Sequence, residues 1–389
     1  MRVLHISMAC NAYVDGWNYQ ENCIPKYHFL DGHLVGMVTV QDTVDEATGA
    51  YCLDERLDYI DDNGVRIYRL PRIVMQGVAF TKKLRVFRGL YAVINNFAPD
   101  LIFIHGIQFL DIHHVIRYVK RNSVRVIIDS HEDYYNSARS WFSRWIVHGI
   151  LWRWCAKRIE PFAEVIWGTL PIRCDFMVDV YGMPQEKVKL LVMGAEDEKV
   201  KAALSSESRS EKRAELGIDE DSFVIVTAGK LNEGKACVIN LMQAVNQFSD
   251  ANIRLVFAGS VVPKLHKAFN QQLSEHVIDA GWQNSEELYR LMGIADLIVF
   301  PGSHSVLWEQ AIALGKPCVF RRFEGMSHLD LGGNCLFIED TSTESLVETI
   351  KELYFNQEKH ASMKSVAVEK GMQRFSYQRI SRESIAPNL

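Results

Sequence analysis

The stretch FVIVTAGKLNEGKA, residues 223–236, contains the pattern on which this chain is built. Its first six residues are apolar or β-branched, which predicts a strand buried on both faces, as in a parallel sheet. Gly229 follows the strand, and a helix is expected from residue 236 to 248. A glycine lets backbone amides approach a phosphate, and Lys230 and Lys235 would add positive charge near a helix N-terminus. The pattern fits a diphosphate site, and equally a turn with two solvated lysines.

The alternation of strand and helix continues on both sides of this stretch. It predicts further strands at Val35–Val40, Leu101–His105, Val124–Asp129, Glu164–Trp167, Val188–Val192, Ile253–Ala258, Leu297–Phe300 and Lys316–Phe320. Helices are expected between them, among others at Tyr19–Leu30, Ser285–Met292 and Leu307–Leu314. Pro25 should kink or break the first of these. We therefore expect the α/β class, with doubly wound Rossmann-like sheets.

A charged, serine-rich stretch, Glu198–Leu216, separates the two sets of strands. We expect an N-terminal domain over residues 1–200 and a second domain over residues 201–372. Residues 373–389 form a C-terminal segment, with the option of packing back on the first domain. Doubly wound domains bind ligands outside the carboxyl ends of their strands, so two of them in series predict a central cleft between facing edges.

The composition excludes several classes of protein. Of 389 residues, 48% are hydrophobic, which excludes a disordered chain. The 43 basic and 48 acidic side chains give a net charge of −5, so we expect no nucleic-acid partner. No run of apolar residues is long enough for a membrane span, and Met1–Ser7 resembles a strand more than a signal peptide. The eight cysteines form no C-x-x-C pair, so we expect neither disulfides nor a zinc site, and a cytoplasmic location.

A second polar loop, PGSHSVLWEQA at residues 301–311, follows another predicted strand. Ser303, His304 and Ser305 lie in the loop, and Glu309 lies in the first turn of the next helix. The helix dipole stabilises a carboxylate at this place, which is a purely structural explanation. The functional alternative is that Glu309 accepts hydrogen bonds from the hydroxyl groups of a ribose.

The first domain contains a loop rich in aromatic and amide groups, DGWNYQEN at residues 15–22. Aromatic faces and amide hydrogen bonds suit a carbohydrate, so Asp15, Trp17, Asn18 and Tyr19 are candidates for an acceptor site. The alternative is a helix start in which Trp17 and Tyr19 belong to the core. Packing is the favoured explanation for Trp17, because large aromatic side chains usually lie inside.

Several short segments form an ordered series over residues 223–320. They are Gly229-Lys230-Leu231 with Lys235, Val256-Phe257-Ala258-Gly259, Ala280-Gly281-Trp282, Ala295-Asp296, Pro301, Glu309-Gln310-Ala311 and Gly315-Lys316-Pro317. The series resembles the nucleotide-binding domain of retaining glycosyltransferases of the GT-B fold, of the glycosyltransferase family four type. The first domain is more loosely similar to that family, through Met1–Ile6, Asp15-Gly16, Gly32–Val35, Asp100–Ile102 and Val188–Gly194.

The resemblance implies a donor site in the second domain. Gly229, Lys230 and Lys235 would hold the donor diphosphate, and Lys235 is a catalytic candidate. Glu309 matches the second glutamate of the family's E-x7-E motif, which is expected on the nucleotide ribose. The first glutamate of that motif is missing, and Pro301 stands in its place.

The missing glutamate normally contacts the donor sugar in this family. Ser303, His304 or Ser305 would then contact the sugar through hydroxyl or imidazole hydrogen bonds. In the first domain, the resemblance places Gly16 near the phosphates and the acceptor. It also places His131 near the transferring sugar as a second catalytic candidate, with a capping or buried structural histidine as an equal alternative.

The leading interpretation is a metal-independent, retaining glycosyltransferase of the hexosyltransferase type. It would transfer a sugar from a nucleoside diphosphate sugar, most simply a UDP-sugar, to a glycan or lipid-linked acceptor, without a further cofactor. The resemblance places it in polysaccharide or lipopolysaccharide biosynthesis. One alternative is a UDP-sugar epimerase of the GT-B fold, with Asp129, Glu132 and Asp133 as acid and base. Another is a non-catalytic sugar- or lipid-binding relative.

The net charge conceals two basic stretches in the first domain. Lys82, Lys83, Arg85 and Arg88 belong to the first, and Arg139–Arg158 holds five basic residues, no acidic residue and four tryptophans. A basic, Trp-rich amphipathic helix suits an anionic membrane surface, which would make the protein peripheral on the inner face of the membrane. The alternative is a packed helix whose aromatic side chains face the core while its arginines are solvated.

Overall fold

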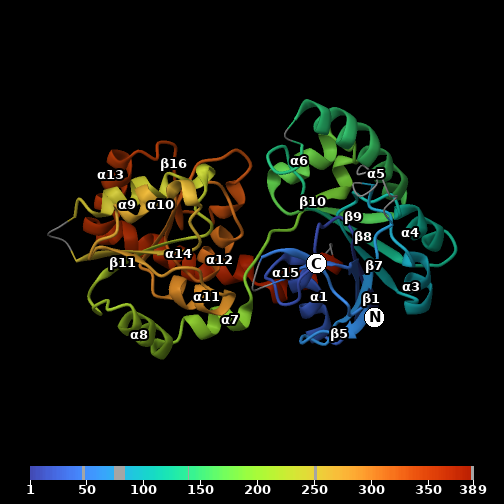
Figure 1. Ribbon diagram of the computed structural model, residues 1–389, viewed down its shortest axis with the longest axis horizontal. Coiled ribbons are helices and arrows are strands. Elements are labelled where there is room, and N and C mark those ends of the chain that lie inside the picture. Colours follow the sequence, from blue (N-terminus) through green and yellow to red (C-terminus); the bar gives the residue numbers. More distant parts are fainter. Residues whose placement is uncertain (46–48, 74–83, 139, 249–251, 387–389) are drawn as a thin grey trace. The chain divides into compact units, whose positions relative to one another are not determined.

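The computed structural model describes residues 1–45, 49–73, 84–138, 140–248 and 252–386 (Figure 1). They form two compact units, an N-terminal unit of Met1–Val192 with Ile380–Leu389 and a C-terminal unit of Met193–Arg379. The chain thus enters the C-terminal unit at residue 193, where the sequence indicated 201, and leaves it after residue 379, where the sequence indicated 372. Both units have the expected α/β class.

The N-terminal unit is built on an eight-stranded sheet with the order β10-β9-β8-β7-β1-β2-β6-β5. Its strands are β1 (Arg2–Ser7), β2 (Leu34–Val40), β5 (Asp58–Ile60), β6 (Arg66–Leu70), β7 (Leu101–His105), β8 (Arg125–Ser130), β9 (Ala163–Gly168) and β10 (Val188–Leu190). Neighbouring strands are parallel, except that β5 runs antiparallel to β6. β3 (Asp42–Val44) and β4 (Tyr51–Leu53) form a separate hairpin.

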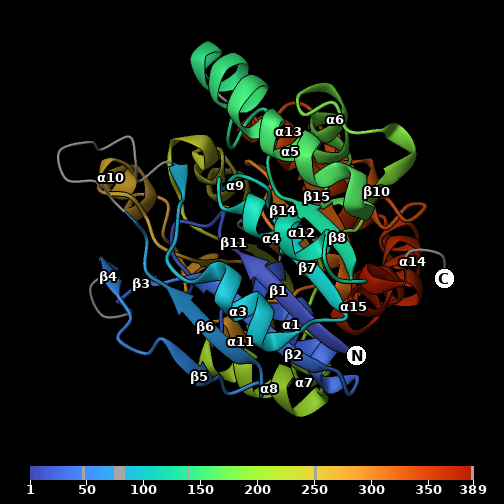
Figure 2. The ribbon, with the colours of Figure 1, turned by 90° about the vertical axis from the view of Figure 1, so that its right-hand side faces the viewer.

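Helices cover this sheet, and Figure 2 looks onto the face in front of which α3 and α4 lie. The helices are α1 (Gln20–Leu30), α3 (Leu90–Phe97), α4 (Ile112–Val119), the π-helix η1 (Ser143–Trp152), α5 (Arg153–Ile159) and α6 (Pro171–Asp179). The predicted break at Pro25 is absent, because α1 continues through it. Pro25 removes one backbone hydrogen bond, but burial of Cys23, Ile24 and Tyr27 holds the helix in place.

The C-terminal unit is built on a six-stranded parallel sheet with the order β13-β12-β11-β14-β15-β16. Its strands are β11 (Phe223–Ala228), β12 (Ile253–Ala258), β13 (Val277–Asp279), β14 (Leu297–Phe300), β15 (Cys318–Arg321) and β16 (Cys335–Ile338). Its helices are α7 (Asp197–Ala203), α8 (Ser206–Glu215), α9 (Val238–Val245), α10 (His266–Asn270), α11 (Ser285–Gly293), α12 (Leu307–Ala313), α13 (Thr343–Phe355) and α14 (Gln357–Phe375). The central strand β11 is almost fully buried, which explains its unbroken apolar sequence.

The charged stretch that marked the domain boundary in the sequence is helical and belongs to the C-terminal unit, as α7 and α8. Two of its charged residues are buried in ion pairs. Lys212 Nζ lies 2.7 Å from Glu287 Oε2, and an Arg213 Nη atom lies 3.1 Å from Asp296 Oδ2. The charged residues of this stretch therefore attach α7 and α8 to the C-terminal unit, and the stretch is not a linker.

The last helix, α15 (Tyr377–Ile385), begins in the C-terminal unit and ends in the N-terminal one. The Trp167 indole N–H donates to the Ser384 carbonyl oxygen at 3.0 Å, and Arg382 pairs with Asp31. This part of the C-terminal segment is therefore packed against the strands and helices of the N-terminal unit. Within the described ranges, the helices fall short of the length and apolarity that crossing a membrane requires.

Candidate functional site

The loop after β11 depends on two glycines that lie against each other. Gly229 has a φ of +115°, and its N–H donates to the Ala258 carbonyl oxygen at 2.8 Å. A Cβ atom at Gly259, which follows β12, would lie 2.0 Å from the Gly229 carbonyl oxygen. Only glycine permits this approach, so the carboxyl ends of the neighbouring strands β11 and β12 are lined by main-chain atoms.

Lys235 lies beside this loop, in the short turn η4 (Glu233–Lys235) that precedes α9. A Cβ atom at Gly302 would lie 2.9 Å from Lys235 Cγ, and one at Gly229 would lie 3.2 Å from Lys235 Nζ. Burial lowers the pKa of Lys235, and within the described ranges no carboxylate forms an ion pair with it. An ammonium group without a counter-ion, at the carboxyl end of a parallel sheet, is suited to bind an anion. Lys230, by contrast, is exposed to solvent.

Glu309 lies in the first turn of α12, as the sequence predicted, and its side chain is fully buried. His304 Nε2 lies 3.0 Å from Glu309 Oε1, and His328 Nε2 lies 3.0 Å from the same oxygen. Burial raises the pKa of Glu309, but the two histidines more than offset this and lower it to about 2. The carboxylate is thus engaged inside its own unit, and contact with a ribose stays a prediction. Sequence reasoning missed His328, which no motif marks.

Ser303 and Ser305 flank His304 in the loop between β14 and α12. Ser303 Oγ lies 4.0 Å from the position that a Cβ atom at Gly234 would occupy, so it borders the turn that carries Lys235. Ser305 Oγ is buried and has no hydrogen-bond partner among the described residues. Among the candidates for the donor site, the structure therefore brings Gly229, Lys235 and Ser303 to one corner of the sheet.

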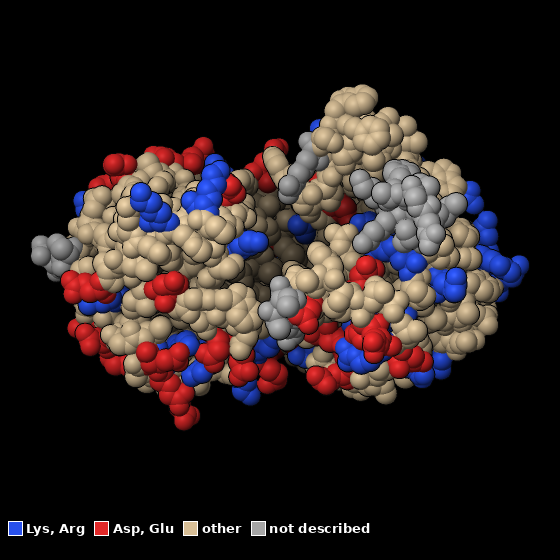
Figure 3. All heavy atoms as spheres, viewed as in Figure 1, with Lys and Arg blue, Asp and Glu red and all other residues tan. Residues whose placement is uncertain are grey.

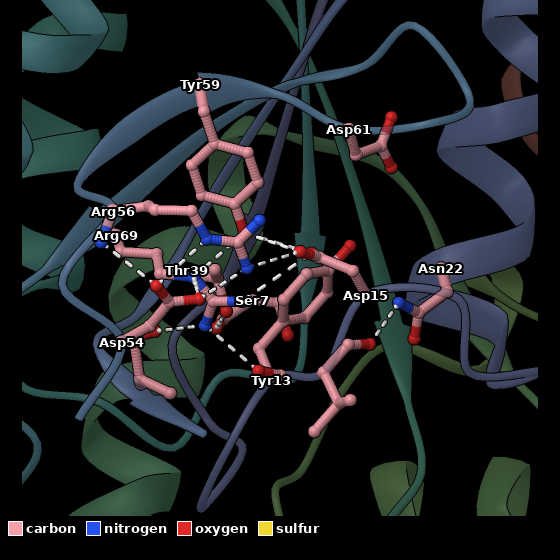
Figure 4. A network of polar contacts seen from close by, with 12 residues as sticks. Ser7, Tyr13, Asp15, Asn22, Thr39, Asp54, Arg56, Tyr59, Asp61 and Arg69 are labelled. Atoms are coloured by element: carbon pink, nitrogen blue, oxygen red, sulfur yellow. Dashed lines mark hydrogen bonds and ion pairs between the residues drawn. The ribbon is translucent and has the colours of Figure 1, made fainter. Parts of the chain in front are cut away.

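On the N-terminal unit, Asp15 belongs to a network of charged and aromatic side chains (Figure 4). Its carboxylate accepts hydrogen bonds from the Tyr59 hydroxyl at 2.9 Å and from Arg56 at 3.1 Å. Arg69, which is buried, lies 3.5 Å from Asp15 and 3.2 Å from Asp54. Sequence reasoning missed these partners, because they lie more than 30 residues further along, in the loop after β4 and in β5 and β6.

The aromatic residues of the same loop lie at the surface. Trp17 is 37% exposed and Tyr19 is 51% exposed, and their rings meet edge to face at 5.2 Å. The expectation that Trp17 packs in the core is therefore wrong. Tyr13 and Val14 before the loop and Gln20 after it are buried, so the chain is anchored on both sides while Trp17 and Tyr19 between them face solvent. Gly16 has a φ of +76° and open space around it, which leaves room for a ligand beside the aromatic pair.

His131 follows β8, and its Nε2 lies 3.5 Å from Asp129 Oδ1. Burial lowers the pKa of His131, but the Asp129 carboxylate more than offsets this and raises it. Glu132 accepts a hydrogen bond from the His131 amide at 3.2 Å, and Asp133 accepts one from Arg173 at 3.2 Å. The other Asp129 oxygen lies 2.8 Å from His105 Nδ1, so the three carboxylates that could serve an epimerase are all held by hydrogen bonds within the unit.

The basic residues near position 85 do not form one surface in the described part of the chain. Lys82, Lys83 and Arg139 lie outside the described residues. Arg85 is half-buried and donates to the Gln108 carbonyl oxygen at 3.0 Å, whereas Arg88 is exposed.

The Trp-rich stretch forms η1 and α5, and Figure 2 shows η1 extending away from the sheet. Its apolar side chains mostly face solvent. Trp141 is 70% exposed, Trp145 56% and Ile150 62%, and Phe142, Ile146 and Trp154 are exposed as well. Trp152, by contrast, is buried. The alternative of a helix whose aromatic side chains face the core is therefore correct for Trp152 and wrong for the other three tryptophans.

The chain has two doubly wound units, each built on a sheet of mainly parallel strands, and this is the GT-B fold. Residues 208–370 match the family model described as "Glycosyl transferases group 1". The Anabaena protein Alr3699/HepE, solved in complex with UDP, is 16% identical, with a TM-score of 0.69 over 100% of this chain and 99% of that one. WaaG, a glycosyltransferase involved in lipopolysaccharide biosynthesis, is 14% identical, with a TM-score of 0.66 over 99% of each chain.

Two further similarities come from other organisms. A putative UDP-N-acetylglucosamine 2-epimerase from Listeria monocytogenes is 14% identical, with a TM-score of 0.62 over 99% of this chain and 94% of that one. An uncharacterized glycosyltransferase of Methanocaldococcus jannaschii, MJ1607, is 24% identical over 156 residues. That match spans 39% of this chain and 40% of the relative. These solved structures share the GT-B fold with this chain, whereas the family model and the MJ1607 match each cover less than half of it.

Proposed function

We propose that this protein is a glycosyltransferase whose donor is a nucleoside diphosphate sugar, with the donor diphosphate bound at Gly229 and Lys235. The observation that carries the proposal is the Lys235 ammonium group, which lies beside a loop lined by main-chain atoms and has no carboxylate partner within the described ranges. The matched family region, residues 208–370, contains this loop. HepE, which has the same fold, was solved with UDP, so UDP is the nucleotide we propose first.

In the proposed reaction, the bond between the sugar and the diphosphate breaks while the acceptor oxygen attacks the sugar. Negative charge then develops on the leaving diphosphate. Lys235 would stabilise this charge where it forms, which is how a fixed electrostatic environment lowers a barrier. Retention of configuration rests on the family resemblance alone, and a hexosyl donor and a reaction without metal are also part of the proposal.

Calorimetric titration with UDP tests the assignment of Lys235. A charge-assisted hydrogen bond contributes roughly 2 kcal/mol, so Lys235→Ala should weaken UDP binding roughly 30-fold. Lys351→Ala is a matched control, since Lys351 is an exposed lysine on α13 of the same unit and pairs with Glu348. Equal affinity of the two variants would remove Lys235 from the donor site.

The proposed acceptor is a glycan or a lipid-linked sugar, in polysaccharide or lipopolysaccharide assembly. Trp17 and Tyr19 support a sugar acceptor, because exposed aromatic rings beside an open glycine suit the apolar face of a pyranose. Incubation with UDP-sugars, with and without acceptor glycans, separates the alternatives. Transfer or slow hydrolysis supports the proposal, whereas conversion of a UDP-sugar to its epimer without acceptor indicates an epimerase. UDP-sugar binding without any turnover indicates a non-catalytic relative.

We also propose that η1 and α5 dock on an anionic membrane surface, where a lipid-linked acceptor would be found. The exposed apolar residues of this helical stretch are accompanied by exposed Arg144, Lys157 and Arg158, and its sequence contains no acidic residue. Arg144 and Arg158 lie over the rings of Tyr134 and Trp154 at 4.6 and 4.9 Å. Apolar side chains with cations beside them are what the interface of an anionic bilayer binds. Sedimentation with vesicles tests this docking.

A further inference from the structure

Three histidines and an aspartate form a hydrogen-bonded chain through the core of the N-terminal unit. His28 Nδ1 lies 3.1 Å from His5 Nε2, and His5 Nδ1 lies 3.0 Å from His105 Nε2. His105 Nδ1 lies 2.8 Å from Asp129 Oδ2. All four side chains are buried. They come from α1, β1, β7 and β8, so the chain of contacts crosses the centre of the sheet.

The far end of this chain lies against α15. His28 Nε2 is 2.8 Å from the Ser381 carbonyl oxygen and 3.2 Å from Ser384 Oγ. The Ser384 hydroxyl donates its proton to the same carbonyl oxygen at 2.7 Å. Both oxygens therefore face His28 Nε2 as acceptors, and this nitrogen must carry a proton.

The proton on His28 Nε2 sets the direction of every following hydrogen bond. A neutral imidazole has one N–H donor and one acceptor nitrogen. His28 Nδ1 therefore accepts from His5 Nε2, and His5 Nδ1 accepts from His105 Nε2. The single proton of a neutral His105 is then on Nε2, yet its Nδ1 faces the Asp129 carboxylate, which is also an acceptor. The four contacts need four protons, whereas three neutral imidazoles supply three.

We infer that this chain holds one additional proton, carried by His105 as a histidinium that donates to both His5 and Asp129. The charge of the Asp129 carboxylate balances the histidinium within the core. Removing the proton would leave two acceptors 2.8 Å apart in a buried site, which costs more than an ordinary lost hydrogen bond.

The neighbouring groups agree with this location of the proton. Burial lowers the pKa of His28 to about 4, although the hydrogen bond to the Ser381 carbonyl oxygen raises it, and burial next to His28 and His105 lowers the pKa of His5. Burial raises the pKa of Asp129, but His105 and His131 more than offset this and lower it. Asp129 is therefore a carboxylate, and the additional proton lies at its end of the chain.

The inference makes His105 a positioning residue for the proposed transfer, and to that extent it rests on the proposed function. Asp129 Oδ1 faces His131 Nε2 at 3.5 Å, so an unbalanced charge on Asp129 would draw a proton to His131. The histidinium at His105 balances that charge and keeps the proton affinity of His131 lower. Glu21 and Arg173 are the other charged groups that act on His131.

Nitrogen NMR of the full chain, labelled with ¹⁵N-histidine and without any ligand, tests the proton count directly. We expect one buried histidine with both ring nitrogens protonated between pH 6 and 8, assigned to His105 by its absence in His105→Asn. His28 should be the tautomer protonated on Nε2. A neutral His105 with a single protonated nitrogen would overturn the inference, and the wild-type spectrum decides even if a variant fails to fold.

The effect on His131 is tested by its NMR titration in His105→Asn, because asparagine can donate to Asp129 but carries no charge. The pKa of His131 should rise by about one unit or more, a tenfold gain in proton affinity. His113→Asn is the matched control, an exposed histidine on α4 of the same unit, and should leave the titration unchanged. An unchanged His131 pKa in His105→Asn would refute the positioning role. Neither measurement uses a donor or acceptor, so failure to find glycosyl transfer would not be confused with failure of this inference.

Discussion

Replacing Glu309 by glutamine tests whether its buried carboxylate holds the loop between β14 and α12 against the rest of the C-terminal unit. In the wild type, this carboxylate accepts hydrogen bonds from His304 in that loop and from His328 in the 3-10 helix Ser327–Leu329. Glutamine has nearly the same shape but offers one acceptor oxygen and two N–H donors. With both histidines as donors to one oxygen and no negative charge between them, the variant loses the electrostatic part of the interaction.

The expected magnitude follows from the pKa of Glu309. Its lowering from 4.5 to about 2 corresponds to roughly 3 kcal/mol of free energy of unfolding. Because the pKa is lower in the folded protein, the unfolded chain binds the proton first as the pH falls. The stabilisation is therefore complete above about pH 5 and is lost as the pH falls from about 4.5 toward 2. Glu309→Gln should be less stable than the wild type by roughly 3 kcal/mol at pH 7, and this gap should narrow below pH 4.5.

Urea unfolding of the full chain, followed by circular dichroism at pH 7, 5 and 3.5, measures this difference. Glu348→Gln is the control, since Glu348 is an exposed glutamate of the same unit, paired with Lys351 at the surface. Such a pair contributes about 0.5 kcal/mol. If Glu309→Gln is as stable as Glu348→Gln at pH 7, the carboxylate is not held as described. If Glu309 also contacts the ribose of the nucleotide, Glu309→Gln should lose affinity for UDP. Its affinity for inorganic pyrophosphate, which has no ribose, should stay unchanged.

Two further predictions concern the glycine loop and the exposed helix. Gly259→Ala would place a Cβ atom 2.0 Å from the Gly229 carbonyl oxygen, so it should destabilise the protein by roughly 3 kcal/mol and weaken UDP binding, as thermal unfolding and calorimetry would show. Gly217→Ala, at a positive φ but in open space, should cost only about 1 kcal/mol, and equal effects of the two would contradict the crowding argument. The double variant Trp141→Ser, Trp145→Ser should lose sedimentation with phosphatidylglycerol vesicles. Trp282→Ser removes a 74% exposed tryptophan of the other unit and should leave the sedimentation unchanged. Unchanged sedimentation of the double variant would refute the docking surface.

The strands that could be predicted best are those buried on both faces. Leu101–His105, Phe223–Ala228, Ile253–Ala258 and Leu297–Phe300 have the predicted bounds, because a buried parallel strand is apolar along most of its length. The strands between Asp42 and Leu70 were missed. β4 is exposed along its length and β5 nearly so, and each is only three residues long, so neither gives a run of buried apolar side chains that a sequence could reveal.

The residues of the candidate sites could likewise be predicted only where their sequence signal is local. Lys235 and Glu309 could be located because turn chemistry and helix starts are local, so the few residues around each one define its place. Their partners could not be located in the same way. His328 reaches Glu309 from the 3-10 helix Ser327–Leu329 before β16, and Arg56 and Tyr59 reach Asp15 from the loop after β4 and from β5. Such pairs are made by the fold, and a single sequence contains no local pattern that joins them.

The histidine chain lies between these two cases. His5 interrupts the apolar run of β1, and His105 and Asp129 end the apolar runs of β7 and β8, so each is an ionisable side chain in a strand that is predicted to be buried. A buried ionisable group requires a partner, and the nearest one available lies on a neighbouring strand. β7 and β8 pair in a register that puts His105 opposite Asp129. Once the strand order is known, the buried ionisable residues of neighbouring strands can therefore be predicted as partners. The sequence alone does not supply that strand order.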